Sequence, residues 1–364
     1  MKHRIRVGIL FGGKSAEHEV SLQSAKNIIN AIDREKYEVV LIGIDKDGYW
    51  HSVNPGHFLS HESDPELIGL EVATDSAVAL TPESKGEIVN LDAHGGISSI
   101  DVAFPILHGT FGEDGTIQGL LKLAGVPFVG SGVLGSAVGM DKDVMKRLLR
   151  DAGIPQAKFI VCTEKSTPSY REAVQSLGTP IFVKPANAGS SIGVSKVRTE
   201  EEYETAIQEA FLYDRKIIIE ENVSGREIEC AVLGNDHPIA SVPGEVILHQ
   251  EFYSYEAKYI DADGATIQIP AELSEEKRAE IQALAIRTFQ TLSCEGLGRV
   301  DLFLKENGEV FVNEINTMPG FTSISMYPKL FEASGIPYPD LIDRLITLAF
   351  ERFESEKKLK TTRE

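Results

Sequence analysis

The sequence predicts an α/β protein built from three successive regions, and three observations lead to this prediction. A chain of 364 residues with 42% hydrophobic content can bury a large core divided among two or three domains. Near its start, apolar strand-like runs alternate with helical patterns, which is typical of a parallel sheet. Near its end, two apolar strands flank Asn307-Gly308, the strongest two-residue signal for a hairpin.

The first region, residues 1–140, is predicted to be a parallel α/β domain. The run RVGILF reads as a strand, the stretch near residues 20–32 as a helix and EVVLIGI as a second strand. Later, VAFPILHG followed by IQGLLKLAG repeats the strand-to-helix order. From about residue 50 to 96 the chain is rich in Ser, Pro, Asp and His, and we expect a surface excursion there, with no assigned function.

The second and third regions are predicted to cover residues 141–225 and 226–364. The second opens with the helix DKDVMKRLLRDAG, closed by Gly153 and Pro155, and continues through the strands FIVC, IFVKP, IGVSKV and KIIIEE. The third contains further strands and a terminal amphipathic helix, LIDRLITLAFERF.

Charge and composition exclude several classes of protein. The formal net charge of −19 opposes general nucleic-acid binding. No apolar run approaches the roughly 20 residues that span a bilayer, and no signal peptide develops, so we expect a cytoplasmic protein without a membrane partner. Cys162, Cys230 and Cys294 are far apart and lack metal-ligand spacing, so we expect reduced core residues.

The hairpin predicts a metal site. Counting outward from Asn307-Gly308 places Asp301 opposite Glu314 and Arg299 opposite Asn316. Facing carboxylates destabilise a sheet unless something compensates, and two carboxylates with an amide oxygen suit Mg²⁺. The alternative is a solvent-exposed face. The alternation that puts Val310 and Val312 on the same face as Glu314 and Asn316 argues against it.

A glycine-rich loop adds a candidate phosphate site. Lys184 ends an apolar strand and is followed by AGSSIG, whose backbone N–H groups can close over phosphates. If the metal site is left out of account, an ordinary glycine-rich hairpin is an equally good interpretation of this loop. Lys142 lies at the start of its helix, and whether it has a function depends on the fold. Glu220 and Glu227 could bind adenine and ribose, although a solvated acidic turn is the simpler interpretation of each alone.

Residues 8–15, GILFGGKS, match the phosphate-loop pattern G-x-x-x-x-G-K-[ST], but we reject this assignment. Ile9, Leu10 and Phe11 continue a strand, and only Gly12-Gly13 can turn. The following helix start can still bind a ligand, and Glu17 there could pair with a substrate ammonium. The alternative is that Glu17 and its acidic neighbour only complement the helix dipole.

Eight motifs in order carry a family resemblance: GGKSAEHEVSL, HGTFGEDGTIQGLL, VGSG, DK, VKPANAGSSIGVSKV, EAKY, GRVDLF and NEINTMPGFTS. Together they resemble the D-alanine–D-alanine ligases of the ATP-grasp superfamily, from about Arg4 to Phe350. The resemblance implies an ATP-grasp architecture of three domains, in which the N-terminal parallel α/β domain precedes the two ATP-grasp domains that hold ATP between them.

The resemblance also implies roles for individual residues. Asp301, Glu314 and Asn316 would hold two Mg²⁺ ions, with Mn²⁺ as a substitute. The residues implied for ATP are Lys142, Lys184 and Lys258 at the phosphates and Glu220, Glu221, Val223 and Glu227 around adenosine. Those implied for the two D-alanines are Glu17, His108, Ser190, Tyr259, Ser325 and Gly320.

The implied reaction is ATP-dependent ligation of two D-alanines through an acyl phosphate, for peptidoglycan precursor synthesis, by a homodimer. Arg299, beside the metals, would stabilise the tetrahedral oxyanion with N–H groups near Gly320. EFYSYEAKY would form a lid, and Tyr259 within it favours the dipeptide over an ester to D-lactate. The base that deprotonates the second D-alanine is not identified. Another ATP-grasp ligase and a phosphate-loop NTPase that depends on Lys14 are the alternatives.

Overall fold

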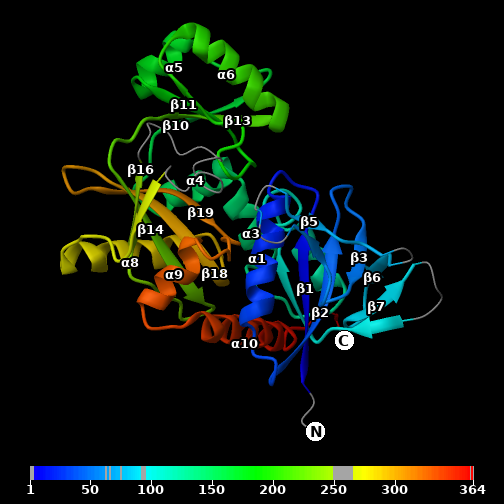
Figure 1. Ribbon diagram of the computed structural model, residues 1–364. Coiled ribbons are helices and arrows are strands. Elements are labelled where there is room, and N and C mark those ends of the chain that lie inside the picture. Colours follow the sequence, from blue (N-terminus) through cyan, green and yellow to red (C-terminus); the bar gives the residue numbers. More distant parts are fainter. Residues whose placement is uncertain are drawn as a thin grey trace.

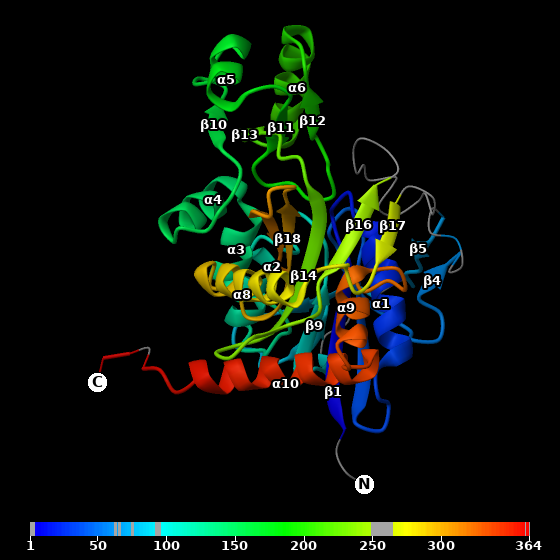
Figure 2. The ribbon, with the colours of Figure 1, turned by 90° about the vertical axis from the view of Figure 1, so that its left-hand side faces the viewer.

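A computed structural model describes residues 4–61, 64, 67–73, 76–91, 96–248, 265–360 and 362–363. Figure 1 shows three parts: an N-terminal part around β1, a C-terminal part around β14 and β18, and a smaller part with α5 and α6 that projects above the C-terminal part. Helix α10, Tyr338–Glu356, runs along the base beneath the two larger parts (Figure 2). Among the described residues, no helix has the length and apolar character needed to cross a membrane.

The N-terminal part contains a four-stranded sheet in the order β3-β2-β1-β9. Its strands are β1 (Ile5–Gly12), β2 (Tyr37–Ile44), β3 (Trp50–Val53) and β9 (Val102–Ile106), and β1 is parallel to both β2 and β9. Helix α1 (His18–Ala31) follows β1, while α2 (Thr116–Leu123) and α3 (Val133–Met140) follow β9. The predicted parallel α/β arrangement is therefore confirmed.

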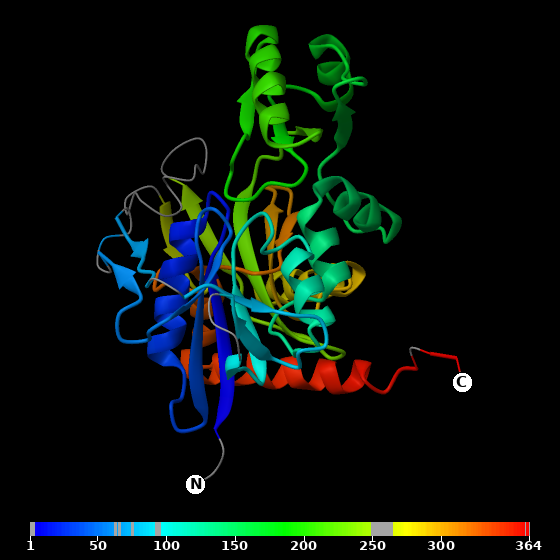
Figure 3. The same ribbon diagram turned by 90° about the vertical axis from the view of Figure 1, so that its right-hand side faces the viewer.

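The segment after β3 corrects one expectation. It forms the pair β4 (Leu59–Ser60) and β5 (Gly69–Leu70), and the sheet β6 (Val78–Leu80), β7 (Glu87–Asn90) and β8 (Gly96–Ser99). Val78 and Ile88 are buried in one core with Leu10 and Ile42 of the main sheet. The β4/β5 pair instead contributes Leu59 to the core that contains Phe11 and Leu41. The segment is thus part of two cores rather than a surface excursion, and its short strands lie beside the main sheet (Figure 3).

The projecting part is an antiparallel sheet covered by helices. Its strands are β10 (Phe159–Thr163), β13 (Lys216–Glu221), β11 (Ile181–Pro185) and β12 (Ser195–Val197), in that spatial order. Helices α5 (Tyr170–Leu177) and α6 (Glu200–Tyr213) pack on it around a core of their own. Both helices begin with a Ser or Thr capping box, which satisfies their first N–H groups.

The C-terminal part is built on a second antiparallel sheet, in the order β17-β16-β14-β18-β19, with β15 paired to β14. The strands are β14 (Arg226–Gly234), β15 (Ile239–Ala240), β16 (Gly244–Leu248), β17 (Ala265–Gln268), β18 (Gly296–Leu304) and β19 (Val310–Asn316). Its helices are α8 (Glu275–Thr291), α9 (Met326–Ala333) and α10.

Two hydrophobic cores tie the parts together. The largest one joins Phe104 of β9 to Tyr327 of α9 and Leu345 of α10, so the N-terminal and C-terminal parts share a core. Helix α4 (Lys142–Asp151) packs its Leu149 in the same core as Val300 of β18. The predicted boundaries at 140/141 and 225/226 stay a prediction. All three cysteines are buried free thiols, as expected.

Candidate active site

The hairpin of β18 and β19 has the predicted pairs: Asp301 lies opposite Glu314 and Arg299 opposite Asn316. Two irregularities make this possible. The turn closes one residue wider than predicted, because Lys305, not Glu306, pairs with Glu309 through its N–H. A register shift between Asp301 and Leu302 then restores the predicted pairs.

This bulge corrects the prediction about faces. Val310, Val312 and Ile315 are buried in one core, whereas Glu314 and Asn316 are partly accessible. Because the extra residue changes the alternation, the carboxylate and the amide lie on the face opposite the two valines. The sequence had suggested that these polar groups interrupt a buried face, and in the structure they do not.

The carboxylates of the hairpin are balanced by cations of the chain. Arg299 donates two hydrogen bonds of 2.7 Å to Asp301, and its Nε lies 3.0 Å from Glu229 of β14. Lys142 lies 3.3 Å from Glu314. Within the described residues, no group of three or more His, Cys, Asp and Glu side chains is placed to hold a metal. Two carboxylates and an amide oxygen still fit the all-oxygen preference of Mg²⁺.

A buried charge cluster lies where β11, β13 and α4 meet. Glu220 of β13 forms ion pairs with Lys184 of β11 through one oxygen and with Lys146 of α4 through the other. Burial raises the pKa of Glu220, but the two ammonium groups outweigh it and the net direction is downward. Nearby, Lys142 donates a 2.7 Å hydrogen bond to the carbonyl oxygen of Ala188, at the start of the glycine-rich loop.

The same loop reaches the N-terminal part at Glu17. Ser190 Oγ donates a hydrogen bond to Glu17 Oε1, although 173 residues separate them. A Cβ atom at Gly189 would lie 3.1 Å from Glu17 Oε2, and one at Gly109 would lie 2.8 Å from it. With φ at +73° as well, position 109 favours glycine for two reasons. Glu17 is thus enclosed by backbone from two loops.

A second carboxylate, Glu113, lies beside Glu17. It accepts a 2.6 Å hydrogen bond from the N–H of Gly109. Burial, followed by the charge of Glu17, raises the pKa of Glu113 to about 8. Glu113 is therefore a neutral carboxylic acid near pH 7, next to a carboxylate that is predicted to bind an ammonium.

His108 and the loop after β19 are bonded to each other. His108 Nδ1 donates to the carbonyl oxygen of Met318 at 3.0 Å, and Ser24 Oγ lies 3.2 Å from Nε2. Burial lowers the pKa of His108 to about 4, so the ring is neutral. Both ring nitrogens thus have protein partners, and a substrate contact by His108 stays a prediction that would need one of these bonds to exchange.

Gly320 and Ser325 lie close together in that loop. A Cβ atom at Gly320 would lie 2.8 Å from Ser325 Oγ, which accepts a 3.0 Å hydrogen bond from the N–H of Thr322. Ser24 Oγ also accepts a bond from the N–H of Phe321 at 3.1 Å. Helix α1 therefore holds the loop whose backbone is predicted to bind substrate.

The predicted adenosine residues lie at the β13–β14 connection. Glu221 ends β13 and accepts a 2.8 Å hydrogen bond from the N–H of Lys158, Val223 follows in the turn, and Glu227 lies near the start of β14. All three side chains are partly accessible, which a ligand contact requires. Lys258 and Tyr259 lie outside the described residues.

Three charged residues of the site were missed by reasoning from the sequence: Glu113, Lys146 and Glu229. One signal was available for Lys146, because it follows Lys142 by four residues and so shares its face of α4. Glu229 alternates with Glu227 along β14, which predicts a shared face. Glu113 gave no signal except its place in the HGTFGEDG motif.

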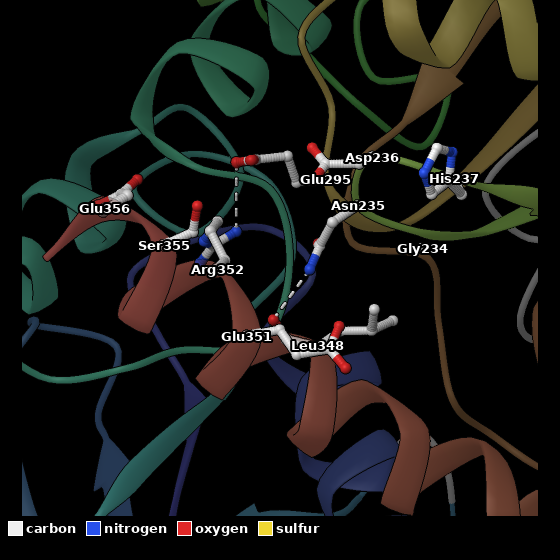
Figure 4. Close-up of a pocket in the computed structure, with 10 residues that line it drawn as sticks. All are labelled: Gly234, Asn235, Asp236, His237, Glu295, Leu348, Glu351, Arg352, Ser355 and Glu356. Atoms are coloured by element: carbon white, nitrogen blue, oxygen red, sulfur yellow. Dashed lines mark hydrogen bonds and ion pairs between the residues drawn. The ribbon is translucent and has the colours of Figure 1, made fainter. Parts of the chain in front are cut away.

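A separate pocket of about 270 Å³ lies at the Gly234 end of β14, against α10 (Figure 4). None of the predicted site residues lines it. Arg352, on its wall, donates to the carbonyl oxygens of Gly130 and Phe128 and lies 3.7 Å from Glu295. Four of its ten lining residues are acidic. Arg352 connects the C-terminal helix to the N-terminal part through these bonds.

Comparisons with known proteins find matches that cover nearly the whole chain. Residues 6–131 match the model of the D-ala D-ala ligase N-terminus, and residues 148–347 that of the C-terminus. The chain is 54% identical over 360 residues to a D-alanine–D-alanine ligase of Oceanobacillus iheyensis, covering 98% of each.

Two solved structures are similar throughout. The D-alanine-D-alanine ligase from Coxiella burnetii has a TM-score of 0.85 and 39% identity, with 98% of this chain and 96% of that one covered. The VanG D-Ala:D-Ser ligase from Enterococcus faecalis has a TM-score of 0.81 and 34% identity, with 95% and 100% covered.

Proposed function

This chain belongs to the D-alanine–D-alanine ligase family, and from this premise we propose how its residues carry out the ligation. The fold is that of the family, an N-terminal domain with a parallel sheet followed by an ATP-grasp portion. The activity is D-alanine–D-alanine ligation, which supplies a precursor of peptidoglycan. The family uses ATP and Mg²⁺, and its substrates are ATP and D-alanine.

For the nucleotide, we propose a site between β11, β13 and the hairpin of β18 and β19. Lys142 and Lys184 would bind phosphate oxygens. This is supported by their positions near the glycine-rich loop, since Lys184 lies in the strand that leads into it and Lys142 donates to Ala188 at its start. Glu221, Val223 and Glu227 would surround adenosine. A contact of Glu220 with adenosine would require it to release Lys146 or Lys184, because both of its oxygens are already paired. Lys258 is proposed for a phosphate on the family resemblance alone.

For the first D-alanine, we propose that Glu17 binds the ammonium and that Ser190 orients Glu17. The hydrogen bond between these two side chains is the single observation that best supports a substrate site here, because it joins the N-terminal part to the loop that follows Lys184. The carboxylate of this D-alanine would then attack the γ-phosphoryl group of ATP in line, so that the bond to the β-phosphate breaks, ADP leaves and an acyl phosphate forms. Activation is needed because a free carboxylate has no adequate leaving group.

For the second step, the amine of the second D-alanine attacks the acyl phosphate carbonyl and phosphate leaves. We propose that Arg299 and the N–H groups near Gly320 stabilise the oxyanion that develops. Ser325, His108 and Tyr259 are proposed to bind or orient the D-alanines. Tyr259 and Lys258 would act from a lid that excludes water.

For the metal, we propose that Asp301, Glu314 and Asn316 hold two Mg²⁺ ions, which Mn²⁺ could replace. The donor chemistry and the pairing of Asp301 with Glu314 support this assignment. When bound, the ions would neutralise charge on the phosphates. The chain's own Arg299 and Lys142 hold these carboxylates and would have to share them with the ions.

We also propose that the chain forms a homodimer. Helices α2 and α3 pack together and expose Leu123 and Leu134, at 63% and 62%. Light scattering of the purified chain gives the mass directly, and a monomeric mass at micromolar concentration would contradict the proposal.

The assignment of residues is tested by phosphate release from ATP and Mg²⁺ with D-alanine, D-serine, D-lactate or L-alanine, with products identified by mass spectrometry. We expect release with D-alanine and D-alanyl-D-alanine as the product. The variant Glu17→Gln should raise the KM for D-alanine and leave ATP binding unchanged. An unchanged KM for D-alanine in this variant would refute the ammonium site.

A further inference from the structure

Lys146 is a fully buried ammonium that none of the proposed roles uses. It lies on α4, four residues after Lys142, so both side chains project from one side of the helix. Its side chain has no exposed surface, and its nearest charged partner is Glu220. Burying an ammonium is costly unless it is paired, so this position needs a physical reason.

The reason lies in how Glu220 divides its two oxygens. One oxygen pairs with Lys146 and the other with Lys184, and all three side chains are buried, with exposures below 10%. A pair of Lys184 and Glu220 alone would be neutral. With Lys146 added, the three groups carry a net charge of +1 beside the glycine-rich loop.

We propose that Lys146 is a positioning residue, which keeps Lys184 available to a nucleotide phosphate by binding the other oxygen of Glu220. Without Lys146, the carboxylate would pair with Lys184 alone and cancel its charge. A phosphate would then meet a neutral ion pair instead of an ammonium. This inference rests on the proposed role of Lys184 as a phosphate ligand.

The test compares nucleotides that differ only in their phosphates. Binding of ADP and of adenosine to the full-length chain is measured by calorimetry, for the parent and for Lys146→Met, whose side chain is similar in length and has no charge. We expect the ratio of ADP affinity to adenosine affinity to fall roughly tenfold or more, since a charge-assisted hydrogen bond to phosphate is weakened. Arg147→Met, on the exposed side of the same helix, should leave the ratio unchanged.

A second variant separates positioning from a structural role. In Lys146→Met with Glu220→Gln, no carboxylate remains to neutralise Lys184, so the ratio should recover toward the parent value. The double variant also removes the buried carboxylate along with the buried ammonium, so the test remains possible if the single variant unfolds. The inference would be overturned if Lys146→Met left the ratio of ADP affinity to adenosine affinity unchanged, which includes an equal loss for both ligands. It would also be overturned if the ratio did not recover in the double variant.

The variant Lys184→Met distinguishes this failure from failure of the proposed site. If Lys184→Met leaves the ratio unchanged, Lys184 is not a phosphate ligand and both proposals fall. If Lys184→Met lowers the ratio and Lys146→Met does not, the phosphate site stands and only the role of Lys146 is refuted.

Discussion

Substitution of Glu113 by Gln should make the stability of the chain less dependent on pH. Burial and the charge of Glu17 raise the pKa of Glu113 from 4.5 to about 8. The folded chain therefore holds a proton that the unfolded chain releases between these two values. For such a group the free energy of unfolding falls as pH rises through this window.

The magnitude follows from the size of the shift. Each pKa unit corresponds to about 1.4 kcal/mol, so a shift from 4.5 to about 8 removes roughly 5 kcal/mol of stability between the two limits. Glutamine mimics the neutral acid and can accept the same bond from the N–H of Gly109. The stability of the variant relative to the parent should therefore rise by roughly 4 kcal/mol between pH 5 and pH 9, because a small part of the shift already acts at pH 5.

The assay is urea unfolding followed by fluorescence of Trp50, the only tryptophan, which lies in β3 of the N-terminal sheet. Free energies of unfolding are compared at pH 5, 6.5, 8 and 9. Glu87→Gln, at an exposed position of β7, is the matched control and should give a curve parallel to that of the parent. If the curves of parent and Glu113→Gln are also parallel, Glu113 does not hold the proton and the reasoning is refuted.

Three further predictions address other parts of the molecule. Asp301→Asn should raise the Mg²⁺ concentration for half-maximal phosphate release by roughly tenfold or more, since a charged ligand is lost, and an unchanged Mg²⁺ titration would contradict the metal assignment. Arg352→Met should lower the free energy of unfolding in urea by about 3 to 5 kcal/mol, because two buried carbonyl oxygens lose a charged donor, and a change below about 1 kcal/mol would contradict this. Lys14→Ala should leave ATP affinity unchanged in calorimetry, and a large loss would revive the phosphate-loop interpretation.

The hairpin illustrates what the sequence can predict. The pairing of Asp301 with Glu314 was predicted correctly, but from a turn that was one residue too tight and without the bulge that compensates for it. Local signals such as Asn307-Gly308 place a turn to within a residue. A bulge depends on which side chains the core accepts, and so it was not visible in the strand pattern alone.

The rejected motif shows the opposite case. Ile9, Leu10 and Phe11 are all fully buried in β1, as the strand pattern predicted, so GILFGGKS cannot wrap a phosphate. Here the apolar residues decided the structure, and the motif letters did not. Contacts between distant segments could not be predicted from the residue pattern alone. The hydrogen bond between Ser190 and Glu17 is an example, because it joins two parts that fold around separate cores.

The charged residues of the site form groups, and the net charge of each group is opposite in sign to the ligand that it is proposed to bind. Lys146, Glu220 and Lys184 sum to +1 where a phosphate is expected. The set of Glu229, Arg299 and Asp301 sums to −1 where a divalent cation is expected.

Glu17 follows the same rule for a substrate ammonium. Its neighbour Glu113 is neutral near pH 7, so the two acids together carry one negative charge and not two. A fully neutralised set would attract its ligand weakly, and a larger excess would make the unliganded fold costly to form. Single unit charges in low-dielectric surroundings satisfy both requirements, because each is large enough to select the sign of the ligand and small enough for its neighbours to stabilise.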